Sequence, residues 1–473
     1  MDPVFLNGVG LGITGPTYPD QGPSGAVQAL GIQPSGAILV GGGGGMGRHN
    51  NLGELTALKR VLPDGSLDLS FAPNGAFTQG PHTTVMGQVS EVNAILVNAD
   101  GSFFIGGVFE NYGPAGTVRS LVAKANADGT LDLTFVPPTL ASNGAGRYVQ
   151  SLALDKNGGL LIGGAFSAGG RANLIRVDAQ TGAQDLTFDS SAVAGNSRVV
   201  DCISLAQDGR IYVSGSAGSF GGYPYVFRLL QGGQEDTSFY VPFANEYGRV
   251  NRVLALPSGQ VIIGGGYSLV GQPEGAFLTG LTASGAPDAA FNANLGTGTN
   301  GWVGGLLQLL PDGRILAGGI FNVFNETPVA SLVILNPDGT RDTTFTPAPY
   351  STDRNSYLTH IYSAVPLNDG RIVAGGWFSR VTDPELEINN LVAFEGDGTA
   401  GAGVLKFSSP VYSALEDGGS VTVQVARTAG IAGAVSVNYA TGGGNAVAGT
   451  HYTSSSGSLN WADGEGGAKS KLF

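Results

Sequence analysis

The sequence contains few of the residues from which disulfides, zinc sites and nucleic-acid interfaces are built. Cys202 is its only cysteine and it has four histidines, so no intrachain disulfide can form and no H-E-x-x-H or Cys–His spacing for zinc is present. Charged residues make up only 12%, with 23 Lys and Arg against 36 Asp and Glu, a net charge of -13 and no basic cluster. This balance excludes a phosphate-backbone partner, and we expect no nucleic-acid binding.

Long apolar runs and known catalytic motifs are also missing. No stretch approaches the roughly 18 apolar residues of a membrane-spanning helix, so we expect no membrane insertion by this chain. The N-terminal MDPVFLNGVG lacks the basic and then apolar pattern of a signal peptide, and we expect any export signal to lie outside this chain. Without a G-x-S-x-G elbow or a P-loop, the sequence predicts no catalytic residue and no cofactor for the main part of the chain.

Glycine and short apolar runs are abundant instead. The chain has 79 glycines, and its hydrophobic residues, 42% of the total, occur in runs such as FFIGG and RIYVSG. Helical periodicity is absent throughout. This composition is typical of many short strands joined by tight turns, and it predicts an all-β protein.

Three blocks recur in register along the first 400 residues. D-x-x-F occurs seven times at intervals of 51 to 66 residues, from Asp2–Phe5 to Asp342–Phe345. A block such as VNAILVNADGSFFIGG, from Val92, also occurs seven times, and a third, such as LVAKANADGT from Leu121, precedes each later D-x-x-F. Each unit predicts four short antiparallel strands, with D-x-x-F on the fourth, as in a propeller blade.

Tight turns are predicted at fixed places in every unit. Each of the two hairpins in a unit has a glycine that usually follows Asp, Asn or Ser, as at Gly101 and Gly129. This pattern predicts two-residue type I′ turns, whose central residues need positive φ.

The ends of the repeat region predict that the ring is closed. The seventh unit ends near Thr399 without a D-x-x-F, whereas the chain begins with a spare copy, Asp2–Phe5. We expect this N-terminal segment to supply the outer strand of the last blade, so that no blade lacks an edge strand. The fold predicted for residues 1–400 is therefore a seven-bladed β-propeller with N-terminal strand closure.

These units resemble the delta-60 repeat, a bacterial propeller-type repeat with the hallmarks G-G-x-F and D-G-x-x-D-x-x-F. The resemblance covers about residues 1–400, with departures at Ser214–Gly215 and at Gly43–Gly44. The family has no established activity, so the resemblance implies the propeller fold and no function.

Residues 401–473 carry different marks. An F-s-s-x-x-Y start, V-x-V-x-R at Val423–Arg427 and G-T-x-Y at Gly449–Tyr452 resemble a Calx-β domain, an immunoglobulin-like β-sandwich. The closing strands are missing from the match, so we expect an incomplete sandwich that is marginal or disordered alone. The resemblance implies Ca²⁺ binding by carboxylates, for which Glu416 is the candidate ligand and Asp463 and Glu465 are further candidates. It also implies further Calx-β-like domains in the full-length protein.

The aspartate of D-x-x-F invites a metal or catalytic role, but a structural role explains it better. A basic residue lies eight positions before it in three units, whereas Gly280 and Ile334 fill that place in two others, so an ion pair is not the general reason. We expect the carboxylate to accept backbone N–H groups at the start of the outer strand, and the phenylalanine to pack between blades. The Gly–Gly pairs likewise predict close backbone approach rather than a phosphate site.

Propeller topology indicates where a binding site belongs. Both tight turns of each blade lie on one face of the disc, and the variable connections lie on the other, where binding residues concentrate on rigid scaffolds. The candidate binding residues of this loop face are aromatic and imidazole side chains suited to sugar stacking or protein contact. They are His49, Tyr112, Tyr148, Tyr223, Trp302 and Trp377.

The sequence leaves three functions open. The preferred one is a non-enzymatic binding or structural display module of a bacterial secreted or cell-surface, adhesin-like protein, which recognises a protein or glycan through the loop face. The second is a propeller-type glycan hydrolase or lyase with carboxylates at the central channel. The third is a structural subunit of an extracellular filament.

Overall fold

The computed structural model describes residues 26–43, 57–63, 65–68, 70–71, 91–114, 116–144, 146–195, 198–218, 222–245, 247–272, 276–345, 360–367, 371–383, 386–394, 404–407, 412, 419–428, 434–442, 445–462, 465 and 467–472. The predicted closing segment Asp2–Phe5 lies outside this set, as do His49 and Glu416.

Between residues 26 and 394 the described residues form seven antiparallel sheets of three strands each, here numbered sheets 1 to 7 in chain order. Sheets 1 to 3 are β1 (Val27–Ile32), β2 (Ile38–Gly42) and β3 (Leu58–Val61); β4 (Glu91–Val97), β5 (Phe103–Val108) and β6 (Val122–Ala125); and β7 (Tyr148–Leu154), β8 (Gly159–Ala168) and β9 (Arg171–Asp178). Sheets 4 and 5 are β10 (Arg198–Leu205), β11 (Ile211–Ala217) and β12 (Tyr223–Leu229); and β13 (Arg249–Ala255), β14 (Val261–Gly266) and β15 (Leu278–Leu281). Sheets 6 and 7 are β16 (Leu306–Leu309), β17 (Ile315–Gly318) and β20 (Leu332–Leu335); and β21 (His360–Pro366), β22 (Ile372–Asp383) and β23 (Leu386–Phe394). Smaller elements are the pair β18 (Val323–Phe324) and β19 (Thr327–Pro328), the 3-10 turn η1 (Ser191–Val193) and the helix α1 (Ala289–Leu295).

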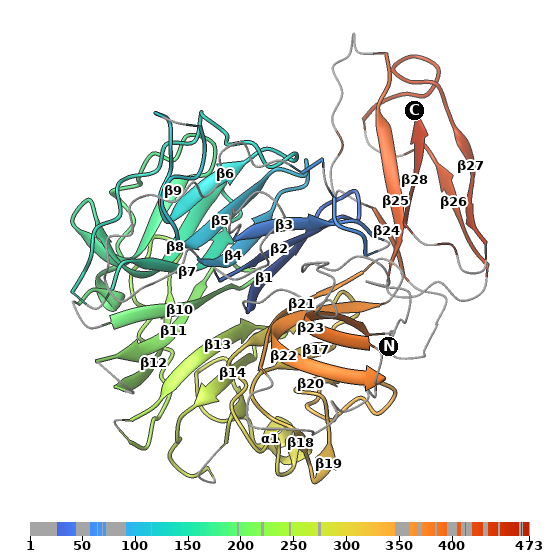
Figure 1. Cartoon of the computed structure of the whole chain (residues 1–473). Coiled ribbons are helices and arrows are strands. Elements are labelled where there is room, and N and C mark those ends of the chain that lie inside the picture. The colour runs from blue at the N-terminus through green and yellow to red at the C-terminus, as the bar shows by residue number, and fades with distance from the viewer. Residues whose placement is uncertain are drawn as a thin grey trace.

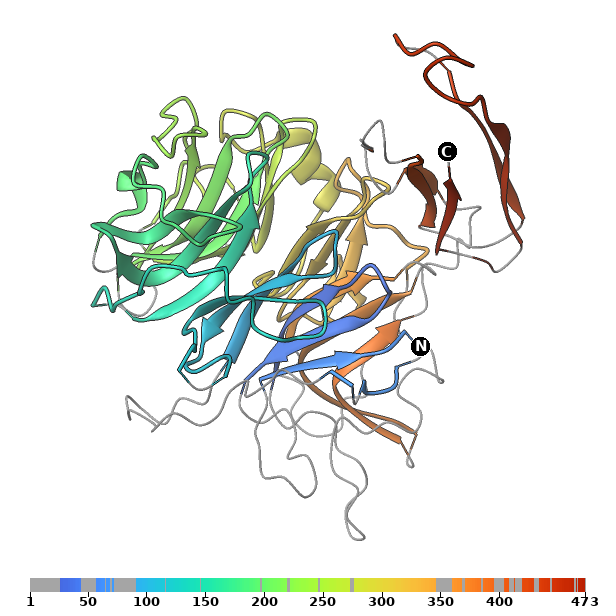
Figure 2. The ribbon, with the colours of Figure 1, turned by 90° about the horizontal axis from the view of Figure 1, so that it is seen from above.

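The sheets follow one another around a ring. The first strand of each sheet contacts the first strand of the next, from β1 to β21, and β21 in turn contacts β1. Figures 1 and 2 show the result, with sheet 1 in blue lying beside sheet 7 in orange. The all-β class and the predicted propeller architecture are confirmed.

The hairpin turns differ from the predicted type. In the first hairpin of sheet 2, the Asn98 N–H donates to the Ser102 carbonyl at 2.8 Å and the Gly101 N–H donates to the Asn98 carbonyl at 3.0 Å, which leaves a three-residue loop. Gly101 has a φ of 86°, whereas Asp100 is not among the residues with positive φ. A type I turn followed by a left-handed glycine has this geometry, so the prediction of two-residue type I′ turns is wrong. The Asp100 carboxylate favours this longer loop because it accepts the Ser102 N–H, at 2.9 Å.

The glycine pair that most second strands carry allows two close approaches. In sheet 2, a Cβ on Gly106 would lie 2.5 Å from Cγ1 of Val149 in sheet 3, and a Cβ on Gly107 would lie 2.0 Å from the Glu91 carbonyl oxygen. A β-bulge in β4 lies opposite this pair, and β1, β7, β10, β13 and β21 carry the same bulge. The prediction of close backbone approach is confirmed.

The joint between the last sheet and the first has the same form as the others. A Cβ on Gly375 in sheet 7 would lie 2.3 Å from Cγ1 of Val27 in sheet 1. The Leu30 N–H also donates to the Ser363 hydroxyl across this joint, at 3.0 Å. Sheets 7 and 1 therefore pack directly together through described residues.

The predicted fourth strand is reduced to a single bridge. In sheet 2, Ala125 pairs with Leu131, and equivalent isolated bridges occur in sheets 1 and 3 to 6. The chain then turns at Asp132–Phe135, because the Asp132 carboxylate accepts the N–H two residues later. The prediction that D-x-x-F lies on a strand is wrong. At Asp288 the turn continues as the helix α1, and the Asp288 side chain caps its N-terminus.

Residues after 403 form a second β-domain. The strands β24 (Val404–Phe407), β25 (Thr422–Thr428) and β28 (Gly467–Leu472) make one sheet, and β26 (Val435–Ala440) pairs with β27 (Ser456–Trp461) in another. Trp461 and Arg427 are buried, and the Arg427 guanidinium donates to the carbonyls of Ala462 and Glu465. These strands, red in Figure 1, stand to one side of the ring and agree with the predicted sandwich.

Candidate functional site

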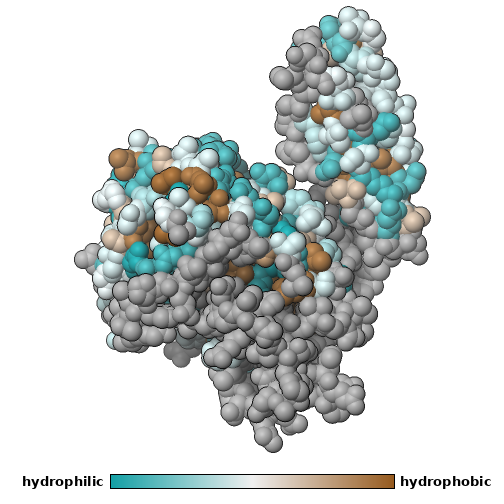
Figure 3. Space-filling model, turned by 45° about the horizontal axis from the view of Figure 1, so that its top comes forward, coloured by the Kyte–Doolittle hydropathy of each residue, from teal (hydrophilic) through white to brown (hydrophobic). Residues whose placement is uncertain are grey.

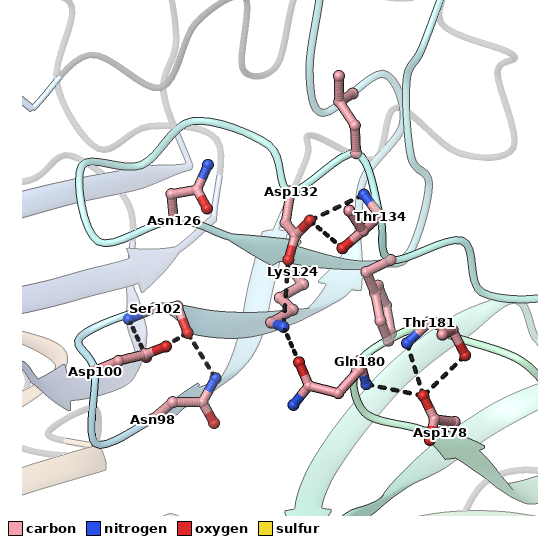
Figure 4. Close-up of polar contacts among 12 residues, drawn as sticks. Asn98, Asp100, Ser102, Lys124, Asn126, Asp132, Thr134, Asp178, Gln180 and Thr181 are labelled. Atoms are coloured by element: carbon pink, nitrogen blue, oxygen red, sulfur yellow. Dashed lines mark hydrogen bonds and ion pairs between the residues drawn. The ribbon is translucent and has the colours of Figure 1, made fainter. Parts of the chain in front are cut away.

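The aspartate of D-x-x-F has a structural role: it holds its own turn and the basic side chain that contacts the next sheet. One Asp132 oxygen accepts the backbone N–H and the hydroxyl of Thr134, at 2.9 and 2.6 Å, and the other contacts the Lys124 ammonium at 3.2 Å. Lys124 also donates to Gln180 of sheet 3 at 3.2 Å, as Figure 4 shows. The same bond to a backbone N–H two residues later occurs at each described copy: Asp68, Asp132, Asp185, Asp236, Asp288 and Asp342. The predicted backbone role is confirmed.

The second oxygen of the D-x-x-F aspartate has a side-chain partner in more units than the sequence predicted. Gln260 donates to Asp288 at 2.6 Å, and Arg314 forms an ion pair with Asp342. Both partners come from the start of the second strand, whereas Gly280 and Ile334 lie on the third. Asp342 thus has an ion pair that the sequence did not predict, whereas an amide holds Asp288, so an ion pair is not the general reason for this aspartate, as predicted.

The basic residues also bind the next sheet. The Arg60 guanidinium donates to the Ala127 carbonyl of sheet 2 at 2.6 Å and lies over the Phe71 ring, 4.7 Å from its centre. The Phe71 ring occupies the space beside Gly129 in sheet 2, where a Cβ would lie 2.7 Å from Cε2. The predicted packing of this phenylalanine between blades is confirmed.

These contacts lower the pKa of the aspartates. The pKa of Asp185 and of Asp236 is about 2, chiefly because the hydroxyl groups of Thr187 and Ser238 donate to the carboxylates. The guanidinium groups of Arg176 and Arg228 lower it further, while burial opposes the shift. Both carboxylates are therefore ionised in the folded protein at neutral pH.

The predicted binding residues do not form a single group. Tyr112 is buried and its hydroxyl donates to the Gly129 carbonyl at 2.6 Å, so it is a core residue and its prediction as a binding residue is wrong. Tyr223, at the start of β12, is 55% exposed. Tyr148, Trp302 and Trp377 lie at the loop-side ends of strands close to the ring axis.

We call this loop-side end of the ring axis the axial mouth. Its outer layer consists of residues at or just before the start of first strands, together with Trp377, which pairs with His360 across β21 and β22. A deeper layer lies at the bulge positions. The outer residues are Glu91, Tyr148, Arg249, Trp302, His360 and Trp377, and the deeper ones include Asp201, Asn251 and Tyr362.

An ion pair joins sheets 4 and 5 at the axial mouth. Arg249 Nε donates to Asp201 Oδ2 at 2.6 Å and Nη2 donates to Oδ1. Asp201, together with Tyr148 of sheet 3, raises the pKa of Arg249. The Asp201 side chain is 3% exposed and the Arg249 side chain 38% exposed. Burial raises the pKa of Asp201, and the Arg249 guanidinium opposes that shift. The cluster thus presents a guanidinium to solvent above a buried carboxyl group.

One glycine lies beside both Arg249 and Trp302. Gly266 is the cross-strand partner of Arg249, and a Cβ on Gly266 would lie 2.7 Å from Cε2 of Trp302. The indole therefore packs against the Gly266 backbone while Trp302 remains 47% exposed. Because directly opposed strand residues have Cα atoms about 5 Å apart, the indole packs close to the Arg249 backbone.

Across the ring, sheets 2 and 7 contribute Glu91, His360 and Tyr362. The His360 Nδ1 and the Tyr362 hydroxyl form a 2.7 Å hydrogen bond, and burial lowers the pKa of His360, so its imidazole is neutral at pH 7. Burial raises the pKa of Glu91. Burial and the Glu91 charge together raise the pKa of Tyr362.

The described residues present no ready metal site. No three His, Cys, Asp or Glu side chains among them are placed to hold a metal ion. A depression of about 530 Å³ beside sheet 3 includes Asp155 and Asp185 in its lining, but Arg176 pairs with both, at 3.5 and 2.7 Å. In the C-terminal domain, Glu465 pairs with Lys469 at 2.6 Å. Because Glu416 lies outside the described residues, Ca²⁺ binding stays a prediction.

Sequence reasoning missed Glu91, Asp201 and Arg249. All three stand directly beside the first valine of a repeated block, where most other copies have uncharged residues. Reading the copies column by column, and asking which positions depart from the repeat, would have singled them out.

Comparison with known families identifies both parts of the chain. A family model described as Domain of unknown function (DUF5122) beta-propeller matches residues 98–135 and 310–345, and the Calx-beta domain model matches residues 399–470. The chain is thus a β-propeller followed by a region similar to a Calx-beta domain. Two stretches of the propeller are similar to the DUF5122 model, and the predicted resemblance to delta-60 repeats and to Calx-β is confirmed.

Similar solved structures share little sequence with this chain. The extracellular domain of a putative hybrid two-component system from B. thetaiotaomicron is 13% identical with a TM-score of 0.31, over 85% of this chain and 46% of that one. A protein of unknown function from Bacteroides caccae is 13% identical with a TM-score of 0.36, over 66% and 95% of the two chains. An endo-1,5-alpha-L-arabinanase from Thermotoga petrophila is 12% identical with a TM-score of 0.32, over 86% and 98%. At these TM-scores the similarities carry no argument about function. No curated protein matches the chain.

None of the helices in the described ranges has the length and apolar character needed to cross a bilayer.

Proposed function

We propose that this protein is a non-enzymatic, carbohydrate-binding display module of a bacterial secreted or cell-surface protein. The observation that supports this function is the axial mouth, where Trp302 and Trp377 are 47% and 58% exposed beside Tyr148, Arg249 and His360. Indole rings stack against sugar rings, and polar side chains around them bind sugar hydroxyl groups.

A glycan fits the described surface better than a large protein partner. On the face shown in Figure 3, hydrophobic residues form separate patches among hydrophilic ones over the described part of the propeller. Large protein interfaces bury a contiguous apolar area, whereas a sugar needs only one or two aromatic surfaces with polar groups around them. Protein binding is therefore the second outcome that the experiments must distinguish.

The carboxyl groups of the axial mouth favour binding over catalysis. Glycosidases commonly place two carboxyl groups on either side of the bond that breaks. Among the described residues of the mouth, Glu91 is a carboxyl group without an ion-pair partner, whereas Asp201 is buried and held by two bonds from Arg249. A hydrolase or lyase would need a second carboxyl group beside Glu91. Either Asp201 would have to leave its ion pair with Arg249, or another acidic residue would have to take part.

The display role extends to the C-terminal domain. In this proposal the propeller is the binding head, and the Calx-beta domain links it to further Calx-beta-like domains of an extracellular or surface-attached protein. Ca²⁺ bound through Glu416 would stiffen that link. Calorimetric titration of the full chain with Ca²⁺, before and after Glu416→Gln, tests this part.

A glycan array probed with the full chain tests the binding function. We expect retained glycans, with affinity reduced roughly tenfold by Trp302→Ala and by Trp377→Ala, because each removes one stacking surface. Tyr240→Ala is the matched control, since Tyr240 is 71% exposed and follows a D-x-x-F turn away from the axial mouth. An array without any retained glycan, or equal binding by all four proteins, would overturn the proposal.

A product assay on the retained glycans tests the non-enzymatic part. We expect no reducing ends or unsaturated products after prolonged incubation. Product release that Glu91→Gln abolishes would establish the hydrolase or lyase alternative instead.

A further inference from the structure

We infer that the axial mouth selects carbohydrates that carry a carboxylate, such as uronic acids, by binding the sugar ring on Trp302 and its carboxylate on Arg249. This inference rests on the proposed carbohydrate-binding function and specifies its ligand class.

Arg249 retains hydrogen-bond donors that face solvent. A guanidinium has five N–H groups. Asp201 accepts two of them, one from Nε and one from Nη2. The remaining donors belong to a side chain that is 38% exposed, whereas its partner Asp201 is 3% exposed. A ligand entering from the loop side therefore meets guanidinium N–H groups before it meets the carboxylate beneath them.

The charge around Asp201 favours an anion. Besides Arg249, Arg252 of the same sheet lies close enough to Asp201 to lower its pKa. Arg252 is held in place because its guanidinium donates to the Gly305 and Asn251 carbonyls, at 2.8 and 2.9 Å. Two arginines near one aspartate leave a local excess of positive charge on this side of the mouth, across the ring from Glu91, in a chain whose net charge is -13. Guanidinium groups bind carboxylates by parallel, charge-assisted hydrogen bonds.

The indole and the guanidinium are placed for one sugar residue. Gly266 lies beside both, as the cross-strand partner of Arg249 and as the backbone on which Trp302 packs. Any other residue at position 266 would displace the indole, because its Cβ would lie within 3.0 Å of three indole atoms. A sugar stacked on Trp302 would thus have its ring substituents next to Arg249.

The experiment compares a carboxylated oligosaccharide with its neutral counterpart. Oligogalacturonate and the same oligomer after carboxyl reduction differ only at the carboxylate, and each is titrated calorimetrically into the full chain. We expect the carboxylated form to bind at least roughly tenfold more tightly, with an affinity that falls as salt is raised.

Variants locate that preference. Arg249→Gln combined with Asp201→Asn removes both charges together and leaves no buried carboxylate without a partner, and we expect it to abolish the preference while retaining weak binding to both oligomers. Trp302→Ala is expected to weaken binding to both. Tyr240→Ala is expected to change neither.

The outcomes separate this inference from the proposed function. Equal affinity for the two oligomers, or a preference that survives in the double variant, would overturn the carboxylate assignment while carbohydrate binding stands. If an array with neutral and acidic glycans retains nothing, the proposed function fails and this inference fails with it.

Discussion

At the scale of single residues, the aspartate of D-x-x-F performs two tasks with its two oxygens. One oxygen turns the chain by accepting the N–H two residues later, and the other usually holds a basic side chain that reaches the next sheet. The first task could be predicted from the sequence because Asp followed by Ser or Thr at the second position is a local pattern. The second could not be predicted in full, because in sheets 5 and 6 the partner comes from another strand.

Removing the charge of one such aspartate should destabilise the propeller. Asp236→Asn leaves the Arg228 guanidinium, whose side chain is 4% exposed, without its carboxylate. We expect the free energy of unfolding to fall by about 1–3 kcal/mol in urea titrations. The control is Glu110→Gln, which breaks the exposed pair with Arg147 and should cost under about 0.5 kcal/mol. Equal losses in the two variants would contradict the role assigned to Asp236.

The same aspartates predict how stability depends on pH. Asp185 and Asp236 have a pKa of about 2 when folded, below the value of about 3.9 for an unfolded chain. Their contribution is therefore complete above about pH 4 and is lost as the pH falls toward about 2. We expect the melting temperature to drop across this range, and to drop less in the double variant Asp185→Asn, Asp236→Asn. Parallel pH profiles for the two proteins would argue that other groups control acid unfolding.

At the scale of elements, the strands of each sheet were predictable from the sequence, whereas the end of each unit and the type of its turns were not. Strand existence followed from the apolar runs, and the seven blocks placed the first two strands of each unit. The fourth strand was predicted wrongly because four strands per unit is the usual blade, while here Asp132 and its counterparts turn the chain after one bridge. The turn type was predicted wrongly because the side chain of Asp100 and its counterparts favours a longer loop.

The close contact of Gly375 in sheet 7 with Val27 in sheet 1 yields a prediction for ring closure. Gly375→Ala would bring a Cβ to 2.3 Å from Cγ1 of Val27, so sheets 7 and 1 would be forced apart. We expect a loss of about 1–3 kcal/mol in the free energy of unfolding and faster amide exchange at Leu30. Adding Val27→Ala should restore part of the loss, because it removes the atom that clashes. A variant as stable as the parent would show that this joint is not tightly packed.

At the scale of the whole molecule, the ring and the axial mouth differ in how far the sequence could predict them. The repeat placed Tyr148, Trp302 and Trp377 on the loop face. It did not show that Arg249 and Asp201 meet, because residues 48 positions apart come together only when two sheets pack side by side. It also did not show that Tyr112 is buried, since an isolated tyrosine in a loop reads as exposed.

The predicted clasp by Asp2–Phe5 can be tested on the whole ring. Arg371 donates to the Pro63 carbonyl across the joint between sheets 7 and 1, at 3.3 Å, just as Arg60 donates to the Ala127 carbonyl across the joint between sheets 1 and 2. Arg371 stands directly before the second strand of sheet 7, as Arg314 does in sheet 6, where it pairs with the D-x-x-F aspartate. We expect deletion of residues 1–5, or Asp2→Ala, to speed amide exchange in β1 and β21 more than in β10 and β13. Uniform exchange in all four strands would contradict the clasp.

The equivalence of the joints also means that the chain need not begin where it does. Except in sheet 4, where Ser214 stands at this place, each second strand offers a glycine to the next first strand, and the pair Gly375 and Val27 resembles the pair Gly106 and Val149. A circularly permuted chain, with new ends in the connection between sheets 3 and 4 and the old ends joined, would keep every inter-sheet joint. Such a permutant should fold to the same ring, with the C-terminal domain tied between sheets 7 and 1 by both of its ends.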